Sequence, residues 1–157
     1  MTRTGTASSI AWMLALLAAL PATALAASAG IEVQDAWAPA GAPSGGEAAL
    51  YMSVVNHGDT PDTLLRVRCP VAAWSTEPRV IDRGEGAPAS RAVKSIPIPA
   101  NATVKLAPGG SHIALLQLKE PLRSGERFSC TVAFGTGGSK EVVVTIAAGT
   151  ESPAAGK

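Results

Sequence analysis

VKLAPGGSHIALLQL, residues 104–118, is the stretch that decides how the chain is interpreted. Two apolar runs flank Pro108 to Gly110, and this order predicts a β-hairpin closed by a tight turn. Side chains two residues apart share one face of a strand, so His112 is expected to face the same way as Ala114 and Leu116. His112 is also the first side chain after the turn that can bind a metal, which makes it the leading candidate for a functional site.

The N-terminal segment has the form of a secretory signal peptide. Arg3 precedes an apolar run over residues 10–20, and the small-residue sequence Ala24-Leu25-Ala26 follows. The apolar run is shorter than the roughly 20 residues that a membrane-spanning helix needs. We therefore expect export with cleavage near Ala26, which removes residues 1–26 and leaves no stable membrane insertion. A retained N-terminal anchor is the alternative.

The remaining chain has the length and charge of one ordinary domain. We expect this domain over residues 27–148 and a small, polar, disordered tail over residues 149–157. Removal of Arg3 lowers the formal net charge from +1 to zero, so no basic surplus is left to bind nucleic acid. Two histidines without a nucleophile motif, and no phosphate-binding glycine loop, give no support for a hydrolase or transferase. We do not expect an enzyme.

Short apolar runs separated by turns predict an all-β fold, an antiparallel sandwich or barrel. The expected strands are residues 31–37, 48–56, 64–69, the two arms of the hairpin, 128–134 and 141–147. Val93 to Ile98 contains Pro97, whose missing N–H restricts this run to an edge strand or an extended loop. Ser75 to Arg91 is polar and broken by prolines and glycines, so we expect an excursion there rather than a core element.

The two cysteines both lie in strand-like patterns. Cys69 is in phase with Leu65 and Val67, and Cys130 is in phase with Phe128, so both sulfurs are expected to face the core. In an exported chain this arrangement predicts a disulfide between them, and two buried free thiols are the alternative. The chain contains no Cys-x-x-Cys motif, so redox catalysis is not expected.

Several segments, taken together, are similar to one known family. They are Asp35-Ala36-Trp37-Ala38, Ala49-Leu50-Tyr51, Asn56-His57-Gly58-Asp59-Thr60-Pro61-Asp62, Pro70-Val71-Ala72-Ala73, and Ile98-Pro99-Ala100 through Pro108-Gly109-Gly110-Ser111-His112 to Leu118-Lys119-Glu120-Pro121-Leu122. They resemble the bacterial periplasmic copper chaperone family PCuAC. The resemblance implies a cupredoxin-like β-sandwich in the periplasm that carries Cu(I) towards the copper centre of cytochrome c oxidase, with Sco-like assembly proteins as partners.

The resemblance also implies a copper site of two histidines and two methionines. His112 matches the second histidine, but Ala114 stands where its methionine partner would be. Counting back from His112, the family spacing puts the upstream methionine near Ser90 and the upstream histidine near Arg79. Three of the four ligands are therefore missing, and a methyl group cannot ligate Cu(I) while an arginine repels it. We expect Cu(I) binding to be weak or absent, and we expect Met52 to belong to the core.

Two interpretations of His112 remain open. It is either a half-exposed imidazole without a metal or one ligand of an altered site. An altered site would join it to His57 or to a carboxylate of the excursion, namely Glu77, Asp82 or Glu85. Carboxylate oxygens are hard ligands that suit Cu(I) poorly, and His57 itself is expected to be an exposed turn residue.

Two functions from different classes follow. The first is a metal carrier, a divergent copper chaperone that binds copper weakly or borrows ligands from a partner. The second is a metal-free interaction module, in which Trp74, Arg79 and the rest of the excursion over residues 75–91 form a partner surface. Because one fold can serve both roles, the choice between them depends on the site.

Overall fold

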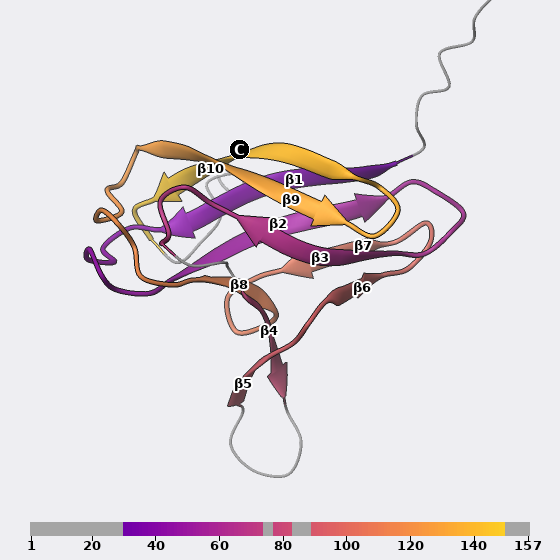
Figure 1. The fold of residues 1–157 in the computed structure, drawn as a ribbon, viewed down its shortest axis with the longest axis horizontal. Helices are drawn as coiled ribbons and strands as arrows, with labels where there is room; N and C mark the ends of the chain where they lie inside the picture. Colours follow the sequence, from indigo (N-terminus) through magenta and orange to yellow (C-terminus); the bar gives the residue numbers. More distant parts are fainter. Residues whose placement is uncertain (1–29, 74–76, 83–88, 150–157) are drawn as a thin grey trace, which may run out of the picture.

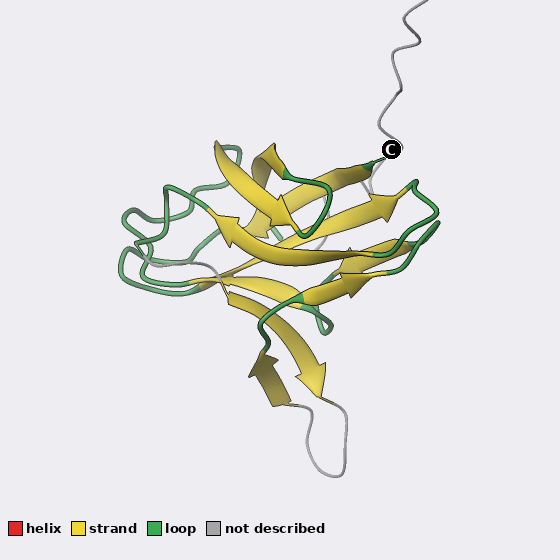
Figure 2. Ribbon diagram, turned by 45° about the vertical axis from the view of Figure 1, so that its right-hand side comes forward, coloured by secondary structure: helices red, strands yellow, loops and turns green. Residues whose placement is uncertain are grey.

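The computed structural model describes residues 30–73, 77–82 and 89–149, and these residues form strands and loops without any helix (Figures 1 and 2). The strands are β1 Ile31–Pro39, β2 Ala48–Asn56, β3 Asp62–Arg68, β4 Glu77–Asp82, β5 Ala89–Ala92, β6 Ile96–Ile98, β7 Thr103–Leu106, β8 His112–Leu115, β9 Arg127–Phe134 and β10 Ser139–Ala147. The predicted all-β class is confirmed. In this described part of the chain, no helix has the length and apolar character needed to cross a bilayer.

The strands form one curled sheet with the order β5-β4-β8-β2-β1-β10-β9-β3-β6, and β7 also pairs with β2. One pair departs from the expected antiparallel arrangement, because β1 and β10 run parallel along Trp37 to Pro39 and Thr145 to Ala147. These are the first and last strands of the domain. They are not joined by a short turn, and only a short turn would have required them to be antiparallel.

The prediction that residues 104–118 form a β-hairpin is wrong. Both β7 and β8 pair antiparallel with β2, β7 along Met52 to Val55 and β8 along Ala48 to Leu50. The two runs therefore lie end to end beside one long strand and do not fold back on each other. β2 has nine residues, so one of its edges is long enough to pair with both runs. Pairing with β2 is therefore favoured over pairing of the two runs with each other.

Residues 107–111 form a compact loop inserted between β7 and β8. The N–H of Gly110 donates to the carbonyl of Ala107 at 2.9 Å, and the N–H of Ala107 donates to the carbonyl of Ser111 at 3.0 Å. Gly109 has a φ of 74°, a left-handed conformation that glycine adopts without steric cost. The loop thus returns the chain to the edge of β2 and places His112 at the first position of β8.

The core is built around β2, whose bounds agree with the predicted strand 48–56. Leu50, Met52 and Val54 are at most 2% exposed, while the alternate side chains of this strand are half-buried. Burial of an apolar side chain of this size contributes about 1.5–3 kcal/mol. The assignment of Met52 to the core is confirmed, and its thioether is enclosed by the sheet.

β3 contains a bulge that changes which leucine faces the core. The register with β9 shifts between Leu64 and Arg66, and the extra residue turns Leu65 outward, where it is 47% exposed. Leu64 and Val67 are fully buried. The expectation that Leu65 faces the core is therefore wrong, whereas Val67 and Cys69 face inward as predicted.

The predicted excursion contains two strands. β4 and β5 pair with each other and form a ribbon that protrudes from the body of the domain (Figures 1 and 2). All four residues of β5 are exposed, as expected for an excursion, but β4 also pairs with β8 and so belongs to the sheet. β6 lies at the opposite end of the strand order, which confirms the edge position predicted from Pro97.

Candidate functional site around His112

His112 begins β8, directly after the inserted loop, and its side chain is half-buried. Its Nδ1 atom lies 3.1 Å from the carbonyl oxygen of Gly110. A carbonyl oxygen can only accept a hydrogen bond, so Nδ1 carries the proton and donates it. In the neutral ring this leaves the lone pair on Nε2, the form of imidazole that binds metals.

His112 belongs to a row of side chains that crosses four strands. Trp37 on β1 and Tyr51 on β2 have ring centroids 4.8 Å apart, and Tyr51 and His112 meet edge to face at 6.3 Å. Trp37 is 4% exposed and serves as a packing anchor. Burial raises the pKa of the Tyr51 hydroxyl above its ordinary value of 10.0. The imidazole is thus supported on one side by an aromatic layer.

Arg79 flanks the imidazole on the other side. In the pairing of β4 with β8, Arg79 is the residue directly opposite His112. Directly opposite residues in an antiparallel pair direct their side chains to the same face, with Cβ atoms about 4.5–5.5 Å apart. The Nε atom of Arg79 is buried. A permanent positive charge therefore stands next to the candidate ligand and disfavours a bound cation.

The other two positions that the resemblance assigns to ligands differ in their placement. Ala114 is fully buried and lies opposite Glu77 on β4 and Ala49 on β2. Ser90 lies in the exposed strand β5, opposite Ile81. Within the described ranges, no three side chains of histidine, cysteine, aspartate or glutamate gather into a metal-binding group.

The remaining candidate ligands are not brought to His112 by the described structure. His57 is exposed and its Nε2 lies 2.7 Å from Oε2 of Glu32. Hydrogen bonds from Gln34 and then from His57 lower the pKa of the Glu32 carboxyl. His57 follows the far end of β2, about 20 Å along the strand from Tyr51. Glu85, Trp74 and the side chains of Glu77 and Asp82 lie outside the described residues.

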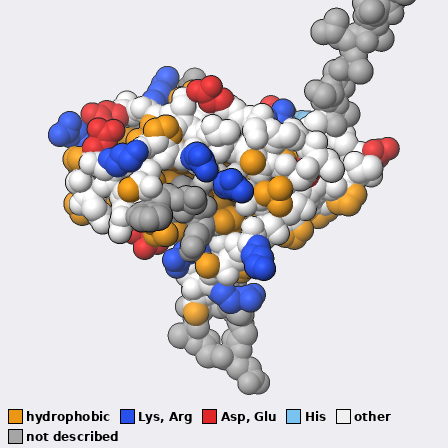
Figure 3. Space-filling view, in the orientation of Figure 1, with side chains coloured by type: hydrophobic (Ala, Val, Ile, Leu, Met, Phe, Trp, Pro, Cys, Tyr) orange, Lys and Arg blue, Asp and Glu red, His pale blue; other side chains and the backbone are white. Residues whose placement is uncertain are grey.

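Cationic side chains cover part of the molecular surface. Figure 3 shows lysine and arginine side chains gathered on one face, over β3 and at the base of the β4–β5 ribbon. Arg66 and Arg68 on β3, Arg91 on β5 and Lys94 after β5 are all exposed. This face favours an acidic partner over a free cation.

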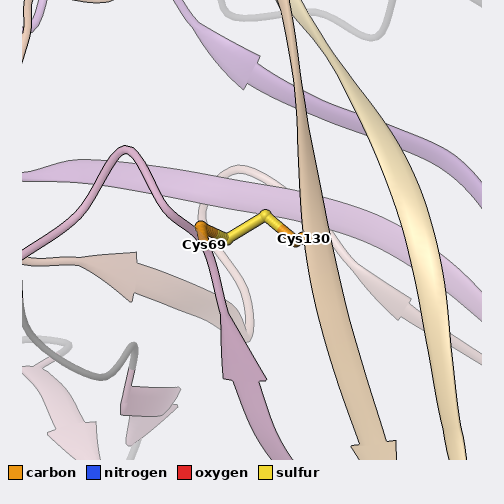
Figure 4. Close-up of a disulfide and its surroundings, with 2 residues drawn as sticks. All are labelled: Cys69 and Cys130. Carbon is orange, nitrogen blue, oxygen red and sulfur yellow. A yellow bond between two sulfur atoms is a disulfide. The ribbon is translucent and has the colours of Figure 1, made fainter.

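A second feature is the disulfide between Cys69 and Cys130, with an S–S distance of 1.99 Å (Figure 4). It joins the end of β3 to the middle of β9. Both cysteines line a groove of about 610 Å³, together with Arg68, Lys119, Thr131 and Glu141. Sequence reasoning did not identify the groove, because Lys119 is brought there by the non-local bridge between Ala72 and Leu118.

Comparison with known proteins assigns the chain to a family. The chain matches the family described as "Putative lipoprotein LpqE-like" over residues 31–146, and it belongs to that family. A curated relative, "Putative lipoprotein Lxx21020" of Leifsonia xyli subsp. xyli, is 31% identical over 117 residues. The match covers 74% of this chain and 69% of the relative.

Solved structures confirm the resemblance to PCuAC domains. The copper-bound PCuAC domain from PmoF2 is 26% identical with a TM-score of 0.66, covering 76% of this chain and 94% of that one. The Cu(I) form of DR1885 from Deinococcus radiodurans is 28% identical with a TM-score of 0.62, covering 76% of this chain and 78% of that one. The chain therefore has the fold of domains whose solved structures contain copper.

Proposed function

We propose that this chain is an exported copper-handling protein that, in its disulfide-bonded form, does not hold Cu(I) tightly by itself. His112 supplies one neutral imidazole, and a partner protein supplies the remaining soft donors. The observation that carries the proposal is the position of His112. It begins β8 on a fold shared with a copper-bound PCuAC domain, with Nδ1 engaged by Gly110 and Nε2 left to bind.

The chemistry of the neighbouring positions supports weak binding. Cu(I) prefers thioether, thiolate and imidazole ligands, and the residue opposite His112 is the cation Arg79. Ala114 offers only a buried methyl group. One imidazole beside a guanidinium favours transfer of the ion to a partner with sulfur ligands over its storage in this domain.

The proposal extends to location and partners. Residues 1–26 have the pattern of a signal peptide, and a Cys69–Cys130 disulfide is typical of an oxidising compartment such as the periplasm. The relatives named as lipoproteins also support export. The partners that we propose are Sco-like proteins that assemble the copper centre of cytochrome c oxidase.

The test is a Cu(I) competition titration of the oxidised mature protein with a set of chromophoric chelators of graded affinity. We expect one weakly held ion in the wild type and none in His112→Ala. His57→Ala is the matched control, because it removes the other imidazole and should leave binding unchanged. Tight binding that persists in His112→Ala would contradict the proposal.

A metal-free interaction module is the second candidate. It is favoured by the cationic face around β3 and by the absence of a three-residue metal-binding group in the described parts of the chain. In this case neither the wild type nor His112→Ala takes Cu(I) from even the weakest chelator. The same titration therefore separates the two functions.

A further inference from the structure

Only three sulfur atoms remain in the chain after residues 1–26 are set aside. They belong to Met52, Cys69 and Cys130. Met52 is 2% exposed within the core strand β2, so its thioether is enclosed by packed side chains. The soft donors that Cu(I) prefers are therefore concentrated in the disulfide.

The disulfide lies beside a groove. Cys69 and Cys130 are only 3% and 2% exposed, yet both line the groove of about 610 Å³ between β3, β9 and the segment around Lys119. Their Cα atoms are 4.3 Å apart, so rotation about the two Cα–Cβ bonds can bring both sulfurs to one ion once the S–S bond is broken.

The charges at this groove favour the metal-binding form of the sulfurs. Arg68 and Lys119 both line the groove. Nearby cations stabilise a thiolate relative to a thiol. Glu141 also lines the groove and opposes this effect, but the two cations outnumber it. His112 is not among the lining residues, so the groove is separate from the site described above.

We propose that Cys69 and Cys130 form a Cu(I) site that is closed by the disulfide and opened by a dithiol reductant. The reductant gives two electrons and two protons to the S–S bond, which yields two cysteine thiols, and its own two sulfurs become a disulfide. Cu(I) then binds both cysteine sulfurs and displaces the two thiol protons. The inference goes beyond the proposed function, which concerns the oxidised protein and His112.

The experiment compares oxidised and reduced mature protein. The disulfide is reduced without oxygen by a water-soluble phosphine, which takes up one water oxygen as it becomes the phosphine oxide. The phosphine is then removed, and Cu(I) is titrated against a chromophoric chelator. We expect the reduced wild type to bind one Cu(I) at least about 100-fold more tightly than the oxidised protein, a gain of about 2.7 kcal/mol. A sulfur-to-copper charge-transfer band should appear in the ultraviolet.

Three variants decide where the ion binds. Reduced His112→Ala should keep the tight binding, whereas Cys69→Ser and Cys130→Ser should each lose it and the ultraviolet band. Far-UV circular dichroism checks that the reduced protein keeps its strands, because loss of the fold on reduction would overturn a site in the folded domain. Equal affinity of the folded oxidised and reduced proteins would also overturn it. Failure of the proposed function would appear in the oxidised titration instead.

Discussion

The two ends of the strand order are held together by very different means. At the β9-β3-β6 end, a disulfide and buried polar side chains fix the strands and loops to one another. At the β5-β4-β8 end, β5 is wholly exposed and β8 pairs over three residues with each of its neighbours. The positions that the resemblance assigns to copper ligands lie at the second end. Substitutions in the exposed strand β5, which contains Ser90, remove few stabilising contacts, so a ligand can be lost there while the fold survives.

Asp62 is the clearest example of the first kind of restraint. Its Oδ1 accepts hydrogen bonds from the N–H groups of Thr63 at 2.7 Å and Thr136 at 2.9 Å, and its Oδ2 accepts one from Gly137 at 2.7 Å. Burial raises the pKa of this carboxyl, but the backbone donors outweigh burial and hold the pKa below its ordinary value of 3.8. The carboxylate thus fixes the β9–β10 loop to the start of β3.

Asn56 has a similar role at the end of β2. Its side-chain amide donates to the carbonyls of Thr60 at 2.9 Å and Pro99 at 3.1 Å, and its carbonyl accepts from the N–H of Gly58 at 2.9 Å. One side chain therefore connects the loop between β2 and β3 with the segment that follows β6. By contrast, the His112 ring donates a hydrogen bond to the carbonyl of Gly110, two residues away in the adjoining loop.

The largest expected effect on stability comes from the disulfide. Replacing both Cys69 and Cys130 by alanine should lower the free energy of unfolding by about 4 kcal/mol. In the wild type the disulfide closes a loop of 61 residues and restricts the unfolded chain, and the variant loses this restriction. Urea denaturation followed by circular dichroism measures the change. A loss below about 1 kcal/mol would show that the disulfide contributes little to the stability of the β9-β3-β6 end of the sheet.

A metal ligand can be added at the β5-β4-β8 end of the sheet. Arg79→His places a second imidazole directly opposite His112 and removes the repelling charge. Cu(I) affinity of the oxidised protein should rise at least about 100-fold, or about 2.7 kcal/mol. Arg79→Gln is the control, since it removes the charge without adding a ligand and should give a much smaller gain. An equal gain in both variants would assign the effect to charge alone.

Asp62→Asn should destabilise the protein by about 2 kcal/mol. The substitution replaces one carboxylate oxygen by an amide N–H group, which cannot accept the hydrogen bond from the backbone N–H that faces it. The folded-state pKa of Asp62 is lowered, so its contribution is present above the unfolded value of 3.8 and is lost as the pH falls through the folded value. Unfolding measured from pH 7 to pH 2 should show this loss in the wild type and not in Asp62→Asn. The exposed Asp59→Asn should behave like the wild type.

The smallest effect is expected at His57. It forms an exposed contact with Glu32, and exposed ion pairs contribute little because water screens them. His57→Ala should therefore leave both the midpoint of thermal unfolding and the Cu(I) affinity within experimental error. A clear loss of Cu(I) binding would instead show that this end of β2 contributes to binding the ion.

Local patterns in the sequence were sufficient for much of the fold. Alternation gave the bounds of β2 and the inward faces of Cys69 and Cys130, and Pro97 indicated an edge strand. These predictions succeed because each depends on the burial or hydrogen bonding of a single strand. The exported, single-domain organisation stays a prediction.

What failed depended on pairing between distant segments. The glycine turn before His112 is local, but whether its flanking runs pair with each other or with β2 depends on the free edge of β2. The bulge that exposes Leu65 is set by the register with β9. Likewise, nothing local shows that β4 would bring Arg79 opposite His112. The surroundings of the candidate ligand were therefore not visible in the sequence.

The end-to-end arrangement of β7 and β8 has a consequence for how this surface can diversify. Side chains alternate along a strand, so lengthening or shortening the 107–111 loop by one residue can slide β8 by a single step and turn the imidazole into the interior. A change of two residues would restore its outward direction. An odd or even change in the length of this loop therefore decides which face of the sheet carries the His112 side chain. Homologous chains that expose a histidine here should differ in this loop by even numbers of residues.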